Sequence, residues 1–346
     1  MSDELFVPGR LCLLGEHSDW AAGYRASHAE IPPGYCLVVG TDQGLRAEAE
    51  RCDDVFEVGS VLPHGEEIGP VRIEADGGAL DAAAREGDFF SYAAGTAAEM
   101  VERFGVGGLR VRIRGDLPVR KGLSSSAAVS VLVARAYASA WGLELSLAEQ
   151  MDIAYAGERR SGSECGRLDQ VCAYGRRVTF LRFDAPGPTV ETLDPGGRFH
   201  LLVVDLRRDK DTRRILADLN ACYPEVQGRV ARGVREALGV RNAELLARAR
   251  VAIETGDAPL LGSLMRDAQA LFDEKVAPAS PELAAPRLHE VLAHPAVEEL
   301  AHGGKGVGSQ GDGCAQLVAR GAEERDRLAR RLERELGVHC MPLTVE

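Results

Sequence analysis

The chain has 346 residues, of which 45% are hydrophobic and 27% are charged, and its formal net charge is −12. This length predicts about two domains, and the composition is that of an ordinary soluble globular protein. The acidic balance argues against a nucleic-acid-binding surface, which requires a basic stripe. It leaves room for a small anionic ligand in a local basic pocket.

Three further features narrow the class of protein. Residues 1–6 include Asp3 and Glu4 and have neither a basic region nor a long apolar core, so we expect no secretory signal. The most apolar predicted helix, 127–141, contains Arg135 and is too short to span a bilayer. The eight cysteines form no CxxC pair, which indicates free thiols in a reducing cytoplasm and gives no zinc-type spacing.

In the first half of the chain, short strands are mixed with helices. The pattern of apolar residues predicts helices where the period is near 3.6 and strands where it is 2. A turn is expected at 41–44, a hairpin or loop at 55–73, and a Pro- and Gly-rich connection between domains at 184–199. The predicted strands are 6–14, 35–40, 45–49, 109–114 and 178–183, and the predicted helices are 88–104, 127–141 and 147–157.

The second half is mostly helical and ends in a strand. We predict helices at 212–219, 226–238, 242–255, 259–272, 282–292 and 322–336, strands at 201–206, 314–318 and 338–345, and a glycine-rich loop at 303–308. Because helices and strands do not alternate regularly, this order favours α+β layers over a doubly wound parallel sheet. We expect one domain over residues 1–190 and a second over 191–346.

The most informative segment is 117–128 (LPVRKGLSSSAA), a small polar loop that leads into an Ala-rich helix. Backbone N–H groups at a helix N-terminus bind anions, and the helix dipole adds to the attraction. The hydroxyl groups can bind phosphate or Mg²⁺. A serine N-cap on an ordinary helix explains the same letters equally well.

Three other segments carry polar side chains in patterns that suit a site. Residues 306–311 match GxGxxG, but a helix is predicted before them and a strand after, which excludes the dinucleotide-binding arrangement. Residues 15–20 (GEHSDW) follow the first strand directly, and Arg10 inside that strand needs a carboxylate or phosphate partner if it is buried. Residues 158–170 place carboxylates beside arginines in a loop rich in helix breakers, where Asp169 is a candidate base.

Together and in this order, these segments resemble the motifs of the GHMP kinase superfamily, and most of all its galactokinase-like sugar kinases. Residues 8–20 (PGRLCLLGEHSDW) resemble the galactokinase signature PGRVNLIGEHTDY, 117–128 the phosphate loop LPxGxGLSSSA, and 165–170 (CGRLDQ) the motif CGxMDQ. Residues 305–314 stand where the family has a third glycine loop. Weaker likenesses at 90–95, 262–265 and 280–283 extend the resemblance over most of the chain.

The resemblance implies an α+β, two-domain GHMP kinase fold, with an N-terminal domain like ribosomal protein S5 domain 2 and a C-terminal ferredoxin-like α/β domain. It implies transfer of the γ-phosphoryl group of ATP to a hydroxyl of a small molecule, with Mg²⁺ as the metal. Asp169 would accept or orient the proton of that hydroxyl, with Arg10 beside it. The expected partner is a monosaccharide, and the expected assembly is a monomer or homodimer.

The resemblance also assigns the remaining roles. Glu16, His17 and Asp19 would hold sugar hydroxyls, and Ser126 and Glu158 would bind Mg²⁺. The spacing from Glu158 to Gly162 is one residue shorter than in galactokinases. The residues implied to bind ATP are Lys121, Gly122, Leu123, Ser124, Ser125, Ser126, Gly308 and Gly311.

Several departures from the family pattern leave the substrate open. Arg120 and Lys121 replace glycines of the phosphate loop, and Asp312 adds a carboxylate to the third loop. We hypothesise that the positive charges of Arg120 and Lys121 compensate the negative charge of Asp312. Trp20 replaces a tyrosine, and residues 267–269 (DAQ) fall where galactokinases often have a Ser-His pair. The alternatives are a kinase for a non-sugar alcohol such as mevalonate and a sensor that binds sugar and ATP without catalysis.

Overall fold

The computed structural model describes residues 4–62, 65–117, 123–184, 187–225 and 227–346. The chain forms two compact units, the first made of Met1–Arg10 and Gly40–Arg176, the second of Leu11–Val39 and Arg177–Glu346. The chain passes from one unit to the other within strands β1 (Leu5–Leu14) and β2 (Gly34–Arg51). The division of domains at residue 190 stays a prediction.

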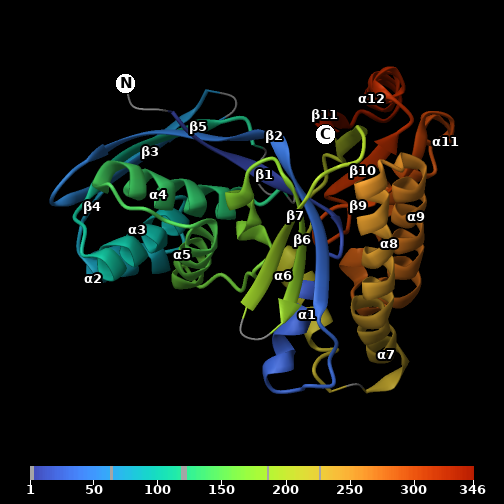
Figure 1. Cartoon of the computed structure of the whole chain (residues 1–346), viewed down its shortest axis with the longest axis horizontal. Helices are drawn as coiled ribbons and strands as arrows, with labels where there is room; N and C mark the ends of the chain where they lie inside the picture. The colour runs from blue at the N-terminus through green and yellow to red at the C-terminus, as the bar shows by residue number, and fades with distance from the viewer. Residues whose placement is uncertain (1–3, 63–64, 118–122, 185–186, 226) are drawn as a thin grey trace. The chain divides into compact units, whose positions relative to one another are not determined.

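The first unit is built on a sheet with the strand order β4-β3-β5-β2. Along its strand β5 (Leu109–Gly115), Leu109, Val111 and Ile113 are buried while the arginines between them are exposed. One face of the sheet is therefore apolar, and helices cover one face in Figure 1. The other elements of this unit are β3 (Val55–Val61), β4 (Glu67–Glu74), α2 (Gly77–Arg85), α3 (Ser91–Phe104), α4 (Ser125–Trp141), α5 (Leu147–Arg160) and the 3₁₀-helix η2 (Asp169–Tyr174).

Two helices of this unit carry candidate site residues at their ends. Helix α4 begins directly after the serine-rich loop, and Gly142 ends it in a left-handed conformation. Helix α5 begins with a capping box between Ser146 and Glu149, which satisfies the first backbone N–H groups. Its last turn contains Glu158.

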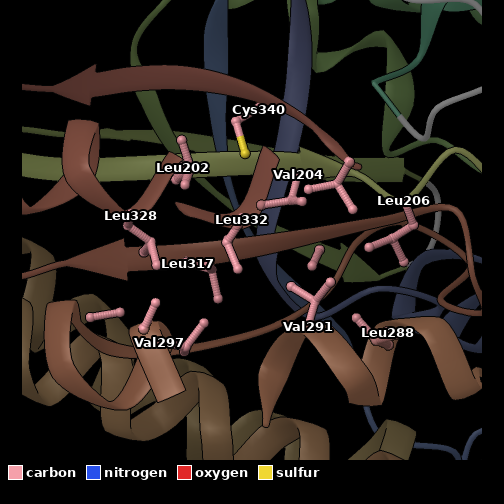
Figure 2. Close-up of a cluster of buried hydrophobic side chains, with 14 of the residues drawn as sticks. Leu202, Val204, Leu206, Leu288, Val291, Val297, Leu317, Leu328, Leu332 and Cys340 are labelled. Atoms are coloured by element: carbon pink, nitrogen blue, oxygen red, sulfur yellow. The ribbon is translucent and has the colours of Figure 1, made fainter. Parts of the chain in front are cut away.

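The second unit contains an antiparallel sheet in the order β11-β8-β10-β9. Figure 2 shows the apolar cluster on this sheet, in which side chains from its strands meet Leu288, Val291, Val297, Leu328 and Leu332 of three helices. All of these side chains are at most 8% exposed, so this cluster is a core of the unit. The elements involved are β8 (Phe199–Asp205), β9 (Ala301–Gly306), β10 (Cys314–Ala319), β11 (His339–Val345), α10 (Pro286–Leu292), α11 (Pro295–Leu300) and α12 (Ala322–Leu336).

The rest of the second unit is mostly helical. A second apolar cluster joins α1 (Ser18–Gly23), which follows the first strand, to helices far along the sequence. Among the described residues no helix is both long enough and apolar enough to cross a membrane. No disulfide joins any of the eight cysteines, all of which lie in the described ranges. The remaining elements are η1 (Tyr24–Ala26), β6 (Val178–Asp184), β7 (Gly187–Leu193), α6 (Thr212–Asn220), α7 (Gly228–Glu236), the π-helical turn η3 (Ala237–Arg241), α8 (Asn242–Thr255), α9 (Ala258–Lys275), η4 (Ala277–Ala279) and η5 (Pro281–Leu283).

The prediction of an α+β architecture is confirmed, but two boundaries are wrong. The turn expected at 41–44 lies inside the single strand β2, whose residues 34–39 pair with β6 and whose residues 45–51 pair with β5. The connection expected at 184–199 contains strand β7, which pairs with β6 at the end of the sheet order. Pro188 is tolerated there because an edge strand needs fewer backbone donors.

The glycine run at 303–308 was also misassigned. Residues 301–306 form strand β9, so a strand, not a helix, precedes the GxGxxG match, and the antiparallel strand β10 follows it. The dinucleotide-binding arrangement stays excluded because no helix follows. The glycines serve packing: a Cβ on Gly303 would lie 2.1 Å from the carbonyl oxygen of Gly262 in α9.

We predict that Gly303→Ala lowers the free energy of unfolding by about 1–3 kcal/mol or more, because the added methyl group must push α9 from β9. Denaturant unfolding of purified protein measures this loss. Gly23→Ala is the control, because a Cβ at Gly23 would meet no atom within 4 Å. Equal stability of the two variants would contradict the packing role of Gly303.

Candidate functional site

The serine-rich loop ends where strand β1 meets helix α4. The backbone N–H of Arg10 donates to the carbonyl oxygen of Leu123 at 3.1 Å. Gly9 permits this approach, since a Cβ there would lie 2.4 Å from a methyl carbon of Leu117 and 3.1 Å from the Leu123 oxygen. Strand β1 therefore contacts the chain on both sides of residues 118–122. Arg120, Lys121 and Gly122 lie outside the described residues.

Ser124 precedes α4 with a left-handed backbone, φ 56°. Its hydroxyl is buried and has no hydrogen-bond partner among the described residues. An unpaired hydroxyl beside the N-terminus of a helix is suited to accept contact with a phosphate group. Leu123, Ser124, Ser125 and Ser126 thus fit the phosphate-binding role predicted for them, and that role stays a prediction.

Ser126 and Glu158, the two predicted metal ligands, are brought together. The Ser126 side chain hydrogen-bonds to Glu158, and Gln170 Nε2 donates to Glu158 Oε1 at 2.7 Å. Glu158 is only 1% exposed. Among the described residues no group of three or more His, Cys, Asp or Glu side chains could hold a metal ion by itself. A hydroxyl and a carboxylate are hard oxygen donors that suit Mg²⁺ when phosphate oxygens complete the shell.

Arg10 and Asp169 form an ion pair beside this group. Arg10 Nε donates to Asp169 Oδ1 at 2.9 Å, and Nη2 donates to the same oxygen. The Arg10 side chain is 7% exposed and that of Asp169 is 29% exposed. Arg10 thus has the carboxylate partner that its buried position requires. Because both N–H groups bind Oδ1, the other carboxylate oxygen remains available to a hydroxyl.

Burial raises the pKa of Glu158 to about 8 from an ordinary value of 4.5, and the nearby Asp169 carboxylate adds to the increase. Hydrogen bonds from Gln170 and Ser126 and the charge of Arg10 act in the opposite direction. Between pH 4.5 and 8 the folded chain therefore binds a proton at Glu158 that the unfolded chain releases. The contribution of Glu158 to stability is greatest at low pH and is lost as the pH rises through this window.

We predict that Glu158→Gln, which cannot ionise, is more stable than the unmodified chain at pH 8 by on the order of 3 kcal/mol in metal-free buffer. The difference should shrink towards zero near pH 4.5. Denaturant unfolding across this pH range measures it, with Glu86→Gln as the control at an exposed site of the same unit. A constant difference between the two proteins at all pH values would contradict burial of an ionisable Glu158.

Glu16, His17 and Asp19 lie in the second unit, in the turn after β1 and the first residues of α1. Trp20 Nε1 donates to His17 Nδ1 at 3.0 Å, and the His17 ring stacks on Phe272 with 6.1 Å between centroids. Because Nδ1 accepts this bond, neutral His17 carries its proton on Nε2, which can donate to an oxygen. Trp20, which departs from the family pattern, therefore sets the tautomer of His17.

Lys305 is a buried cation whose partner the sequence did not reveal. Its Nζ binds Glu16 Oε1 and donates to the carbonyl oxygen of Gly306 at 2.8 Å. The side chains of Lys305 and Glu16 are 2% and 6% exposed. The available signal was a charged residue inside a glycine run before an apolar strand, but its partner is 289 residues away in sequence.

The third glycine loop joins β9 to β10 in the second unit. Gly308 and Gly311 have φ values of 62° and 71°, which glycine adopts without strain. Lys210 Nζ donates to the carbonyl oxygens of Val307 and Gln310 at 3.3 and 2.7 Å, so this cation holds the loop. The assignment of Gly308 and Gly311 to ATP binding stays a prediction.

Asp312 has a partner inside the second unit. Its Oδ1 accepts from the backbone N–H of Leu288 at 2.9 Å, in the first turn of α10. The helix has no side-chain cap of its own at Ala285, so Asp312 supplies the cap from another segment. This contact gives the carboxylate a structural role. The hypothesis that Asp312 compensates the charges of Arg120 and Lys121 stays a prediction, because those two residues lie outside the described ranges.

We predict that Asp312→Ala lowers the free energy of unfolding by about 0.5–2 kcal/mol, as loss of a helix cap does elsewhere. Asp312→Asn keeps an oxygen acceptor and should lose much less. Thermal unfolding of the two variants at one pH measures the difference. Equal destabilisation by alanine and asparagine would show that capping is not the role of Asp312.

Comparison with known proteins agrees with this geometry. A family model for the GHMP kinases N terminal domain matches residues 91–176, which include helix α4, Glu158 and Asp169. A galactokinase from Streptococcus suis is 28% identical over 247 residues, covering 70% of this chain and 58% of the relative. By these likenesses the chain resembles the GHMP kinase superfamily. It is galactokinase-like within that superfamily, and it spans about half the length of the curated relatives it matches.

Solved structures confirm the two-domain GHMP kinase fold. Lactococcus lactis galactokinase complexed with galactose has a TM-score of 0.74 at 18% identity, covering 99% of this chain and 92% of that one. L. major mevalonate kinase in complex with R-mevalonate also has a TM-score of 0.74 at 18% identity, covering 100% of this chain and 96% of that one. At these identities the two likenesses describe the fold and do not distinguish a sugar from mevalonate.

Proposed function

We propose that the chain is an ATP-dependent kinase that phosphorylates a hydroxyl of a monosaccharide, the anomeric hydroxyl by analogy with galactokinases. The observation that carries this proposal is the cluster of Ser126, Glu158, Arg10 and Asp169 at the N-terminus of α4. It combines a phosphate-binding helix end, hard oxygen ligands and a carboxylate with one oxygen available. Phosphoryl transfer requires chiefly positioning and charge stabilisation, which these groups supply.

In this proposal Asp169 receives or orients the proton of the substrate hydroxyl. Arg10 pairs with the Asp169 carboxylate through one oxygen and so leaves the other oxygen to face the hydroxyl. The helix end at Ser124–Ser126, with Lys121, Gly122 and the third-loop residues Gly308 and Gly311, would hold the phosphates of ATP. Mg²⁺, held by Ser126 and Glu158, would neutralise phosphate charge when bound.

A sugar is favoured over mevalonate by the turn that contains Glu16, His17 and Asp19. Two carboxylates and the Nε2 proton of His17 offer acceptors and a donor, which a polyol can satisfy with several hydroxyl groups. Mevalonate, with two hydroxyl groups and a carboxylate, supplies fewer hydroxyl groups to this turn than an aldose does. Release of ADP across a panel of aldoses, with mevalonate included, tests the assignment, and turnover of mevalonate alone would overturn it.

We predict that Asp169→Ala lowers kcat by roughly three orders of magnitude or more, because the base and the orienting group are lost together. Asp169→Asn, of nearly the same shape, should lose a similar factor while it keeps an oxygen for Arg10. Steady-state ADP release with the best aldose measures both variants. Near-normal turnover would exclude Asp169 as the base, and binding of sugar and ATP without turnover by the unmodified chain would indicate a sensor.

A further inference from the structure

The buried ammonium group of Lys305 has fewer acceptors than its charge requires. Its three N–H groups find two acceptors among the described residues, Glu16 Oε1 and the Gly306 carbonyl oxygen. With the side chain 2% exposed, the protein surface offers no general access to water for the third. A buried charge with an unused donor is expensive unless a ligand supplies the acceptor.

An unused acceptor lies at the same place. Gln310 is 2% exposed, and its Oε1 has no hydrogen-bond partner among the described residues. This oxygen lies over Gly306, because a Cβ on that glycine would come within 2.0 Å of it. Near Gly306 there are therefore an ammonium N–H donor of Lys305 and the Gln310 Oε1 acceptor, and a polar ligand group could bind to either.

The end of strand β9 is held rigidly around these groups. The Gly306 backbone N–H donates to Gln269 Oε1 at 2.8 Å, and Gln269 Nε2 donates to Asp273 Oδ1 at 2.8 Å. Gln269, which departs from the galactokinase pattern, thus ties α9 to the residue whose carbonyl oxygen holds Lys305. The direction of the ammonium group is fixed by the fold, so its free N–H is preorganised for a ligand.

We propose that Lys305 is a specificity-determining residue, which binds one hydroxyl of the substrate jointly with Glu16. The hydroxyl donates to the Glu16 carboxylate and accepts from the Lys305 ammonium. This proposal deepens and rests on the proposed function. A fluorine substituent at the same carbon can accept from Lys305 but cannot donate to Glu16. A hydrogen atom at that carbon, as in a deoxy sugar, can do neither.

The experiment compares Lys305→Met with the unmodified chain, using the aldose that the panel identifies and its monodeoxy and monofluoro derivatives. We expect one deoxy position to raise the sugar KM of the unmodified chain about 10- to 100-fold, the usual effect of losing hydrogen bonds to charged groups. Lys305→Met should raise KM for the parent sugar by a similar factor and abolish most of that discrimination. The KM for ATP should stay unchanged.

Two further variants separate a specificity role from a purely structural one. Lys305→Met leaves Glu16 buried without its cation, so the double variant Glu16→Gln with Lys305→Met removes both charges and guards against failure to fold. Its loss of discrimination should be no larger than that of Lys305→Met, because the two residues act on one hydroxyl. Lys275→Met, at a lysine of α9 whose side chain is 31% exposed, is the control and should retain full discrimination.

Each outcome bears on a stated claim. Loss of discrimination at one hydroxyl in both variants supports the proposal. If sugars are turned over but the variants keep the deoxy-to-parent KM ratio while kcat or thermal stability falls, Lys305 is structural and the proposal is overturned alone. If the unmodified chain turns over no aldose, the proposed function is overturned and this inference with it.

Discussion

The removal of charged side chains from water is the constraint on which the candidate site depends. Glu158, Lys305 and Arg10 are 1%, 2% and 6% exposed, and each would destabilise the fold strongly without partners. Each is therefore tied to another segment of the chain: Arg10 to Asp169, Lys305 to Glu16, and Glu158 to Gln170 and Ser126. The ion pairs and hydrogen bonds that these charges require also group Arg10 with Asp169 and Glu158 with Ser126 in the first unit, and Lys305 with Glu16 in the second.

The three buried charges are not compensated to the same degree. Arg10 faces a carboxylate that is partly exposed, whereas Glu158 has two uncharged hydrogen-bond partners and the repulsion of Asp169. Its proton affinity rises in consequence, which is the behaviour expected of an anionic ligand whose cation is supplied from outside the chain. A buried charge that the fold does not compensate fully is typical of functional positions.

Local signals in the sequence predicted much of the fold and part of the site. Some of these signals depend only on residues close together in sequence, so they can be recognised without a structure. They are the alternation of β5, the periodicity of α3 and the serine-rich start of α4. Strand β2 was divided in the prediction because its polar residues near 41–44 match a turn, while its two sets of partners lie far along the chain. Motif resemblance supplied Arg10 and Asp169. The pairing of Lys305 with Glu16 is a tertiary property, and nothing near residue 305 in sequence specifies it.

Gly9 has a consequence for how the serine-rich loop can vary in length. A side chain there would collide with Leu117 on one side of residues 118–122 and approach the Leu123 carbonyl on the other, so one residue of β1 abuts both ends of that segment. The two ends are thus held at a fixed separation by a neighbour that belongs to neither. Substitutions between Leu117 and Leu123 should therefore be tolerated more readily than insertions or deletions. Gly9, the glycine of the PGR triplet, is the residue that sets this constraint on the length of the loop.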